Sequence, residues 1–326
     1  MQFLVIQTAF LGDVILATSV AEKLHQHFPD SQIDFLLRKG NESILENHPF
    51  IHSVLVLDKT KNKLNNLFKI SSRVKKEKYD CIVNLHRFGS SGFITWRSGA
   101  KEKIGFDKNS FSFCYTRKFK HEIGNGKHET ERNHQLISSF TDNTVAKPKL
   151  YPSEKDLNEA RKYKTGDFIC IAPTSVWFTK QFPIEKWAEL INSLDEKTIV
   201  YLIGAKNDFG LCEEIKRKTS KRKHQTENLA GKLSILQTAA LMKDAQMNYV
   251  NDSAPMHIAS AMNAPVTAIF CSTIPAFGFG PLSEKSKVVE TKEKLDCRPC
   301  GLHGHKICPK GHFKCAYTID VKEIIL

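Results

Sequence analysis

One stretch, residues 247–270, constrains the fold of this chain more than any other. It predicts a short strand over Met247–Val250, a polar turn over Asn251–Ser253 and a helix that begins near Ala254. A second strand over Pro265–Phe270 follows at once. Because two parallel strands need a crossover between them, this succession predicts a parallel βαβ unit.

The turn in this unit is a candidate anion site. Asp252 or Ser253 is the expected N-cap of the helix, and Pro255 fits its first turn, where a missing N–H costs nothing. The free backbone N–H groups of a helix start at the carboxyl end of a sheet attract phosphate. His257, one turn into the helix, can point to the same place. An ordinary capped helix explains the spacing equally well.

The same alternation of strands and helices recurs along the chain. It predicts a mostly parallel, doubly wound α/β fold. The expected strands are Gln2–Gln7, Gln32–Leu37, Ser53–Leu57, Cys81–Leu85, Phe168–Ala172 and Thr198–Leu202. Two of the expected helices end near His27 and Thr219, and the others cover Asn65–Lys76, Ser90–Ser98, Glu154–Lys162 and Pro183–Asn192.

The length of 326 residues suits two such domains. The stretch Ala146–Thr165, with two prolines before a charged helix, is the expected boundary. We therefore expect one domain over 1–152, a second over 153–315, and a terminal helix within 316–326 that packs back on the first domain.

The charge is positive overall, with a formal net value of +13, and it is uneven. Lys59–Lys120 holds sixteen lysines and arginines against four aspartates and glutamates. Such a surface indicates an anionic membrane, a nucleic acid or a phosphorylated substrate, unless it only aids solubility. No nucleic-acid-reading motif is recognisable, so nucleic acid is not an expected partner.

Neither an export signal nor a membrane span is expected. Phe3–Ile6 is too short for a signal h-region, and Ser253–Ser283, although uncharged, is interrupted by four prolines. We expect a cytoplasmic protein whose nine cysteines are reduced unless they bind metal.

Two polar segments follow strands of the first half. Gly12 and Asp13 come shortly after the first strand, without the G-x-G-x-x-G spacing of dinucleotide sites. Asp13 is either an N-cap or a functional carboxylate at the edge where ligands bind in open α/β folds. The loop His86–Gly92 is either a binding loop, with His86 and Arg87 as candidates, or a plain connection. The basic, aromatic segment Lys108–Gly126 reads as a loop that covers the site.

At these residues the chain resembles a known family, the ADP-heptose:lipopolysaccharide heptosyltransferases of glycosyltransferase family 9. The resemblance extends over nearly the whole chain and departs from the common pattern at Ala254, where many members have glycine. Its markers are Leu11-Gly12-Asp13-Val14, Ala172-Pro173-Thr174-Ser175, Lys180, Phe182-Pro183, Trp187, Gly204-Ala205 with Asp208, Asn251-Asp252-Ser253-Ala254-Pro255-Met256-His257, Gly280-Pro281 and a Cys-x-x-Cys tail.

The resemblance implies a GT-B fold, with two Rossmann-like domains facing across a cleft. It also implies an inverting transfer, with no required metal or other cofactor, of a heptose from an ADP-sugar to a lipopolysaccharide core acceptor. The enzyme would work at the cytoplasmic face of the inner membrane, as a peripheral protein on its anionic surface.

Roles for individual residues also follow from the resemblance. Asp13 would be the general base, and Lys180 would oppose the charge of the departing diphosphate. Gly12, His86 and Arg87 would lie on the acceptor side. The donor would be held by Thr174, Ser175, Asp208, Asp252, Ser253, Ala254, Pro255, Met256 and His257. Helix N-terminal amides with one lysine are a metal-free way to stabilise a leaving diphosphate.

The tail carries Cys297, Cys300, Cys308 and Cys315, which could bind zinc tetrahedrally. The spacing is not that of a standard zinc finger. The alternatives are a compact loop of reduced thiols, or a basic loop, with Arg298 among its cations, that docks the acceptor.

Two other functions stay open at this point. One is a GT-B transferase that uses a different nucleotide-sugar donor or a lipid-linked glycan acceptor. The other is a non-catalytic nucleotide- or glycan-binding protein on the same scaffold. The presence of Asp13 and Lys180 argues against the second.

Overall fold

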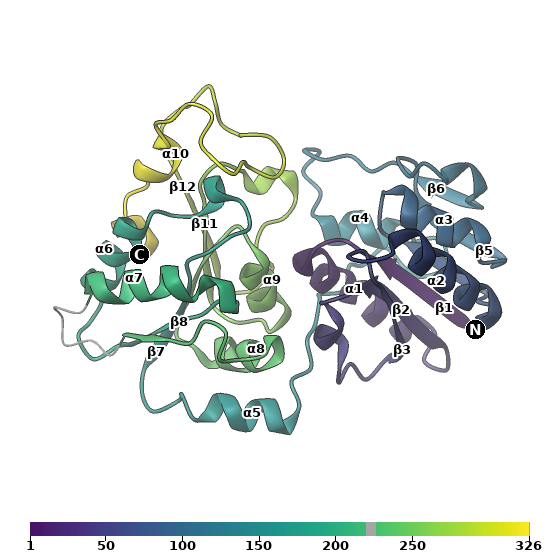
Figure 1. The fold of residues 1–326 in the computed structure, drawn as a ribbon, viewed down its shortest axis with the longest axis horizontal. Helices are drawn as coiled ribbons and strands as arrows, with labels where there is room; N and C mark the ends of the chain where they lie inside the picture. Colours follow the sequence, from purple (N-terminus) through teal and green to yellow (C-terminus); the bar gives the residue numbers. More distant parts are fainter. Residues whose placement is uncertain (220–225, 326) are drawn as a thin grey trace. The chain divides into compact units, whose positions relative to one another are not determined.

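The structure, a computed structural model, describes residues 1–219 and 226–325, which fold as two units (Figure 1). The first unit ends at Tyr151 and the second begins at Pro152. The division therefore falls between the two prolines that precede the charged helix.

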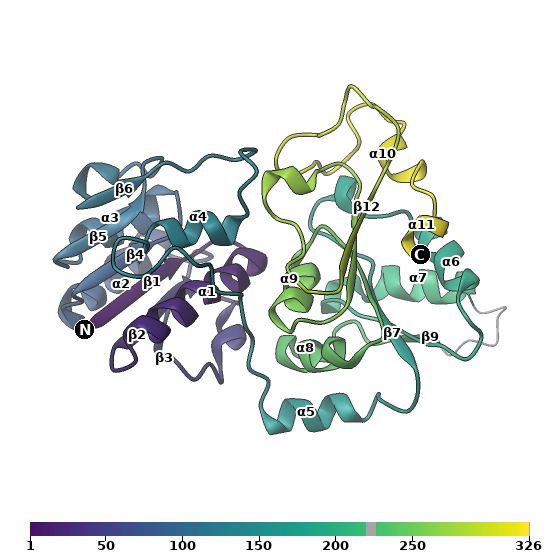
Figure 2. The same ribbon diagram turned by 180° about the vertical axis from the view of Figure 1, so that it is seen from behind.

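The first unit is a parallel sheet in the strand order β3-β2-β1-β4-β5-β6. Helices α1 and α4 pack together, as do α2 and α3, and the two pairs cover opposite faces of the sheet (Figures 1 and 2). Its elements are β1 (Gln2–Gln7), α1 (Leu11–His27), β2 (Gln32–Arg38), β3 (Ile51–Leu57), α2 (Lys63–Glu77), β4 (Cys81–Asn84), α3 (Gly89–Arg97), β5 (Glu102–Phe106), β6 (Arg117–Phe119) and α4 (Glu129–Gln135).

The second unit repeats this plan with the order β12-β11-β10-β7-β8-β9. Helices α6 and α7 lie on one face of the sheet, and α8 and α9 on the other (Figure 2). Its elements are α5 (Glu154–Arg161), β7 (Phe168–Ala172), α6 (Ile184–Ser193), β8 (Ile199–Leu202), α7 (Phe209–Thr219), β9 (Thr226–Asn228), α8 (Ile235–Asp244), β10 (Asn248–Asn251), α9 (Ala254–Ala261), β11 (Val266–Phe270), β12 (Ser286–Glu290), α10 (Lys314–Tyr317) and α11 (Lys322–Ile325).

The expected fold class, two doubly wound α/β units, is confirmed, and the burial of the central strands accounts for it. Phe3–Gln7 of β1 and all of β7, β10 and β11 are buried. Strands covered by helices on both faces are largely apolar, as β1, β7 and β11 are, whereas β10 begins and ends with a buried asparagine. The βαβ unit over residues 247–270 is also confirmed, because β10 and β11 pair in parallel with α9 between them.

The segment Lys108–Gly126 differs from the expectation of a covering loop. It contains the edge strand β6, which pairs with β5 through Ile104 and Arg117. A strand of three residues with two basic side chains has no apolar pattern that would predict it.

The terminal segment also differs from its expected packing on the first domain. Ile319, Val321 and Ile324 are buried in the core of the second unit, together with Trp187 of α6. Their apolar side chains complete that core, whereas the last residue, 326, lies outside the described residues.

Candidate functional site

The first candidate region is the switch point of the first sheet, where β1 and β4 are neighbours and the chain leaves them toward opposite sides. Ligands of doubly wound sheets bind at such a point, beyond the carboxyl ends of the strands. Gly12 and Asp13 lie in the first turn of α1, which follows β1. His86 and Arg87 lie in the loop after β4.

Asp13 is half-buried in the first turn of α1. Its Oδ2 accepts a hydrogen bond from the backbone N–H of Phe10 at 3.2 Å. Loss of solvation, together with the negative charge of Glu129, raises the pKa of the Asp13 carboxyl to about 6. Arg87 acts in the opposite direction but does not cancel this shift. A carboxylate with such a pKa is a suitable base at neutral pH.

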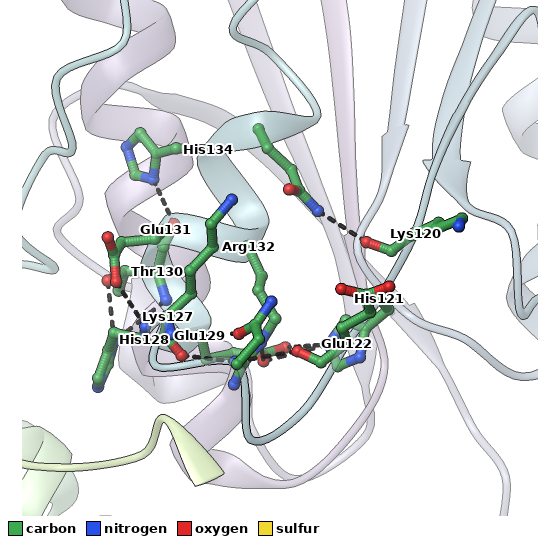
Figure 3. A network of polar contacts seen from close by, with 12 residues as sticks. Lys120, His121, Glu122, Lys127, His128, Glu129, Thr130, Glu131, Arg132 and His134 are labelled. Atoms are coloured by element: carbon green, nitrogen blue, oxygen red, sulfur yellow. Dashed lines mark hydrogen bonds and ion pairs between the residues drawn. The ribbon is translucent and has the colours of Figure 1, made fainter. Parts of the chain in front are cut away.

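A buried polar network surrounds Glu129 at the start of α4 (Figure 3). The Glu129 carboxylate accepts hydrogen bonds from Nε2 of His121 at 3.1 Å and from Nε of Arg132 at 2.7 Å. Burial alone would raise the pKa of Glu129, but these two partners lower it below its ordinary value. Glu129 therefore stays ionised, and its charge acts on Asp13 from the neighbouring helix.

His86 is buried, with its Nδ1 3.1 Å from Oγ1 of Thr8. Burial and the cations Lys59 and Arg87 lower the pKa of His86 to about 3. The Lys59 ammonium donates to both the carbonyl and the hydroxyl of Thr8 at 3.0 Å. His86 is therefore a neutral imidazole, which can donate or accept a hydrogen bond but carries no charge.

The second candidate region is the switch point of the second sheet, between β7 and β10. Nζ of Lys180, in the loop after β7, lies 2.6 Å from Oδ2 of Asp252, directly after β10. The hydroxyl of Thr273, after β11, donates to the same Oδ2 at 2.6 Å. Both members of the ion pair are largely buried, so screening by water is weak.

The start of α9 borders this ion pair. Ser253 is the N-cap, but its side chain makes no capping hydrogen bond, and the Asp252 carboxylate is used by Lys180 and Thr273. The amides of the first turn are therefore not capped by these side chains. Of the remaining predicted donor residues in this turn, Ala254 and Pro255 are partly exposed, whereas Met256 and His257 are buried.

The other predicted donor residues lie on neighbouring loops. Thr174 and Ser175 are partly exposed in the loop after β7. The Ser175 carbonyl accepts from the side-chain amide of Gln181 at 2.7 Å, which fixes the Lys180 loop. Asp208 follows β8, and its carboxylate accepts from the backbone N–H of Ala205 at 2.7 Å. Asp208 thus has a local structural partner in its own turn.

The cysteine tail holds the Lys180 loop. Oγ1 of Thr179 accepts from the backbone N–H of His305 at 2.7 Å, and Ser272 donates to it at 3.1 Å. Arg298 donates to the backbone carbonyl oxygens of Cys271 and Thr273 at 2.7 Å each. Its guanidinium therefore anchors the tail to the end of β11.

The four tail cysteines line one cavity of about 200 Å³. Burial and the neighbouring thiols raise the pKa of Cys315 to about 12. Within residues 1–219 and 226–325, no three or more Cys, His, Asp or Glu side chains are arranged to hold a metal ion. The four cysteines form no disulfide, and their loop is tied to the end of β11.

Several contributors were not predicted from the sequence. Thr273 follows a strand of the second sheet, so the rule that selected Asp252 would also have found it. Lys59 likewise follows a strand, β3, but its contact with Thr8 depends on the tertiary structure. Glu129 carries no such local signal, because only the packing of α4 against α1 brings its charge near Asp13.

Two doubly wound units, each with polar side chains at its switch point, are the plan of the GT-B fold of glycosyltransferases. The family model of glycosyltransferase family 9 (heptosyltransferase) matches residues 67–306. The chain therefore belongs to glycosyltransferase family 9. The expected family and enzyme class are confirmed.

Individual relatives are similar over most of their length. Lipopolysaccharide heptosyltransferase 3 of Escherichia coli is 27% identical over 279 residues, which cover 81% of this chain and 82% of that protein. A family 9 glycosyltransferase from Veillonella parvula has a similar fold, with a TM-score of 0.84, 22% identity and coverage of 99% and 94%. The E. coli heptosyltransferase WaaC with ADP has a TM-score of 0.72, 19% identity and coverage of 88% and 92%.

Proposed function

We propose that this protein transfers a heptose from ADP-heptose to a lipopolysaccharide core acceptor, with inversion at the anomeric carbon and without a required metal. The proposal is supported by membership of family 9 and by relatives named as lipopolysaccharide heptosyltransferases. The donor is suggested by the similar fold of a heptosyltransferase described with ADP.

The second unit binds the donor in this proposal. Negative charge grows on the diphosphate as the glycosidic bond breaks, and Lys180 would oppose it together with the first amides of α9. Thr174, Ser175 and the turn from Asp252 to His257 would hold the diphosphate and the sugar. Because Lys180 already pairs with Asp252, the arriving diphosphate competes with a carboxylate for the ammonium group.

The first unit binds the acceptor in this proposal. Asp13 would take the proton of the attacking hydroxyl, a contribution that is typically about 10²–10⁴-fold in rate. Gly12, His86 and Arg87 would line the acceptor side. The acceptor is a lipid, so we further propose that the protein works as a peripheral protein at the cytoplasmic face of the inner membrane. No helix within the described residues has the length and apolar character needed to cross a bilayer.

One observation carries the proposed reaction, namely the position of Asp13 in the first turn of α1 at the first switch point, and the raised pKa of its carboxyl supports it. Replacing Asp13 by Ala should lower the transfer rate by at least about 10²-fold and leave the binding constant for ADP unchanged. Asp107, an exposed aspartate of the same unit, provides the matched variant Asp107→Ala, which should transfer normally. Unchanged turnover in Asp13→Ala would refute the assigned base.

The donor is tested separately. A thermal-shift series with ADP, ADP-heptose, UDP and UDP-sugars measures which nucleotide stabilises the protein. A response confined to the adenine nucleotides supports the proposed donor, whereas a selective response to UDP-sugars favours a GT-B transferase with another substrate.

A further inference from the structure

Five aromatic rings form one continuous surface on the first unit, outside the candidate site. Consecutive ring centres lie 5.4–5.9 Å apart, from α2 across α3 to the loop before β6. We call this the aromatic surface; its members are Phe68, Phe93, Trp96, Phe111 and Phe113.

The aromatic surface is open to solvent. The exposed fractions are 48% for Phe68, 48% for Trp96 and 71% for Phe113, and Leu64, one turn before Phe68, is 72% exposed. Single exposed apolar residues are ordinary, but a contiguous group of large rings marks a site of interaction.

Cations border the same rings. Arg97 places its guanidinium 5.7 Å from the ring centres of both Phe68 and Phe93. A groove of about 430 Å³ is lined by Phe68 with Ser72 and three basic residues of α2, namely Lys69, Arg73 and Lys76. The only acidic residue of α2 is Glu77, at its end.

We propose that the aromatic surface, with the basic residues of α2, docks this unit on an anionic phospholipid bilayer. Aromatic side chains are favoured at the membrane–water interface, and basic residues beside them are attracted to anionic headgroups. This inference deepens the membrane association put forward above and names the surface responsible.

The arrangement of the rings distinguishes a bilayer from a single-stranded nucleic acid. Bases need open ring faces on which to stack. Phe68 meets Phe93 edge-on, at an interplanar angle of 88°, and Arg97 lies over both rings. Around Phe68 and Phe93, therefore, a cation already lies over the rings on which a base would stack, and the rings form an apolar surface with a charged border.

Vesicle sedimentation with the full chain tests this inference without any transfer reaction, so it can fail while the proposed reaction stands. Wild-type protein should bind vesicles that contain phosphatidylglycerol and should bind neutral phosphatidylcholine vesicles far less. The fluorescence of Trp96 should shift to the blue on binding; Trp96→Phe identifies its share of the signal. Equal binding to both kinds of vesicle, or to neither, would overturn the proposal.

Two double variants separate the apolar part from the charged part. Phe68→Ser with Phe113→Ser should weaken the binding of anionic vesicles. Arg73→Glu with Lys76→Glu should weaken that binding at least about 25-fold, because each lost basic residue costs about fivefold. Matched changes of exposed residues on the second unit serve as controls and should bind as wild type; they are Phe209→Ser with Ile307→Ser, and Lys155→Glu with Lys218→Glu.

Other occupants of the surface give different results. If a second copy of the chain covers it, light scattering will show a dimer that Phe68→Ser with Phe113→Ser converts to a monomer. If a nucleic acid covers it, the wild-type protein will bind oligo(dT) and the same variant will not. Either result, combined with unaltered vesicle binding by the variants, would refute membrane docking.

Discussion

The two switch points share a scaffold but differ in charge. Both sheets have the same strand order when counted along each unit, with the first strand next to the fourth. At the first switch point the prominent group is the Asp13 carboxyl, which has a raised pKa and accepts a hydrogen bond from the backbone N–H of Phe10. At the second it is the Lys180 ammonium, held 2.6 Å from Asp252.

The difference shows that the sheets fix where side chains lie, whereas the segments that follow the strands determine which chemical groups lie there. A carboxyl group that gives up its proton near pH 6 is suited to accept one from an alcohol. An ammonium group already set in an ion pair has a fixed location, so little reorganisation is needed when charge develops beside it. The predictions below test whether the two sites differ in this way.

After the loss of the proposed base Asp13, the largest effect is expected at Lys180. Lys180→Gln removes the cation that would oppose the diphosphate, so kcat for transfer should fall about 10²–10³-fold, as for other preorganised charge-stabilising groups. Donor affinity, measured by calorimetry with ADP, should weaken as well.

A neighbouring lysine gives the matched control. Lys186 of α6 pairs with Glu189 on the surface of the helix, and Lys186→Gln should leave both kcat and ADP binding unchanged. Equal losses in the two variants would show that Lys180 has no special role.

The next effect concerns pH at the first switch point. If Asp13 must be ionised, kcat/KM should fall about tenfold for each pH unit below about 6. His86 does not titrate in this range, because its pKa is lowered to about 3. Glu129→Gln removes a negative charge that raises the Asp13 pKa, so the midpoint of the profile should move to lower pH.

The pH dependence of protein stability tests the pKa of the Asp13 carboxyl independently of activity. A raised pKa means that the folded state favours the protonated carboxyl. Protonated Asp13 therefore contributes stability that is fully present below about pH 4 and is lost as the pH rises through about 6. Asp13→Asn should therefore raise the melting temperature at pH 8 and raise it less at pH 4. A shift of equal size at both pH values would show that the pKa of Asp13 is not raised.

The smallest effect is expected in the tail that holds the Lys180 loop. Gly304 has φ +75°, and a Cβ there would lie 2.8 Å from Oγ1 of Thr179. Gly311 has a similar φ of +72° with nothing within 4 Å of its Cβ. Gly304→Ala and Gly311→Ala should both lose about 1–2 kcal/mol of stability from the left-handed backbone, but only Gly304→Ala should also lower kcat, by a few-fold.

Apolar strands could be predicted from the sequence, the edge strand β3 among them, whereas short polar strands could not. Gln2–Gln7 and Phe168–Ala172 were predicted with the bounds that the structure has, because both are apolar runs between turn residues. The edge strands β6 and β9 have three residues each, largely polar, and they form only because a neighbour offers its backbone.

The positions of the candidate residues were predictable, but their partners were not. Asp13 and Asp252 follow buried strands, and strand ends at a switch point are where ligands bind. The contact of Lys180 with Asp252 joins two loops that are far apart in sequence, and the effect of Glu129 on Asp13 depends on the packing of α1 against α4. Such pairs require knowledge of the tertiary structure.

The burial of Ile319, Val321 and Ile324 has a consequence for how the second unit can be isolated. A chain cut after residue 315 would lose these three side chains and that of Ala316, which pack in the same core as Trp187, and would leave a cavity there. Any fragment meant to keep this core therefore has to extend from Pro152 to at least Ile324, and a purification tag joined directly after it would lie next to these buried side chains.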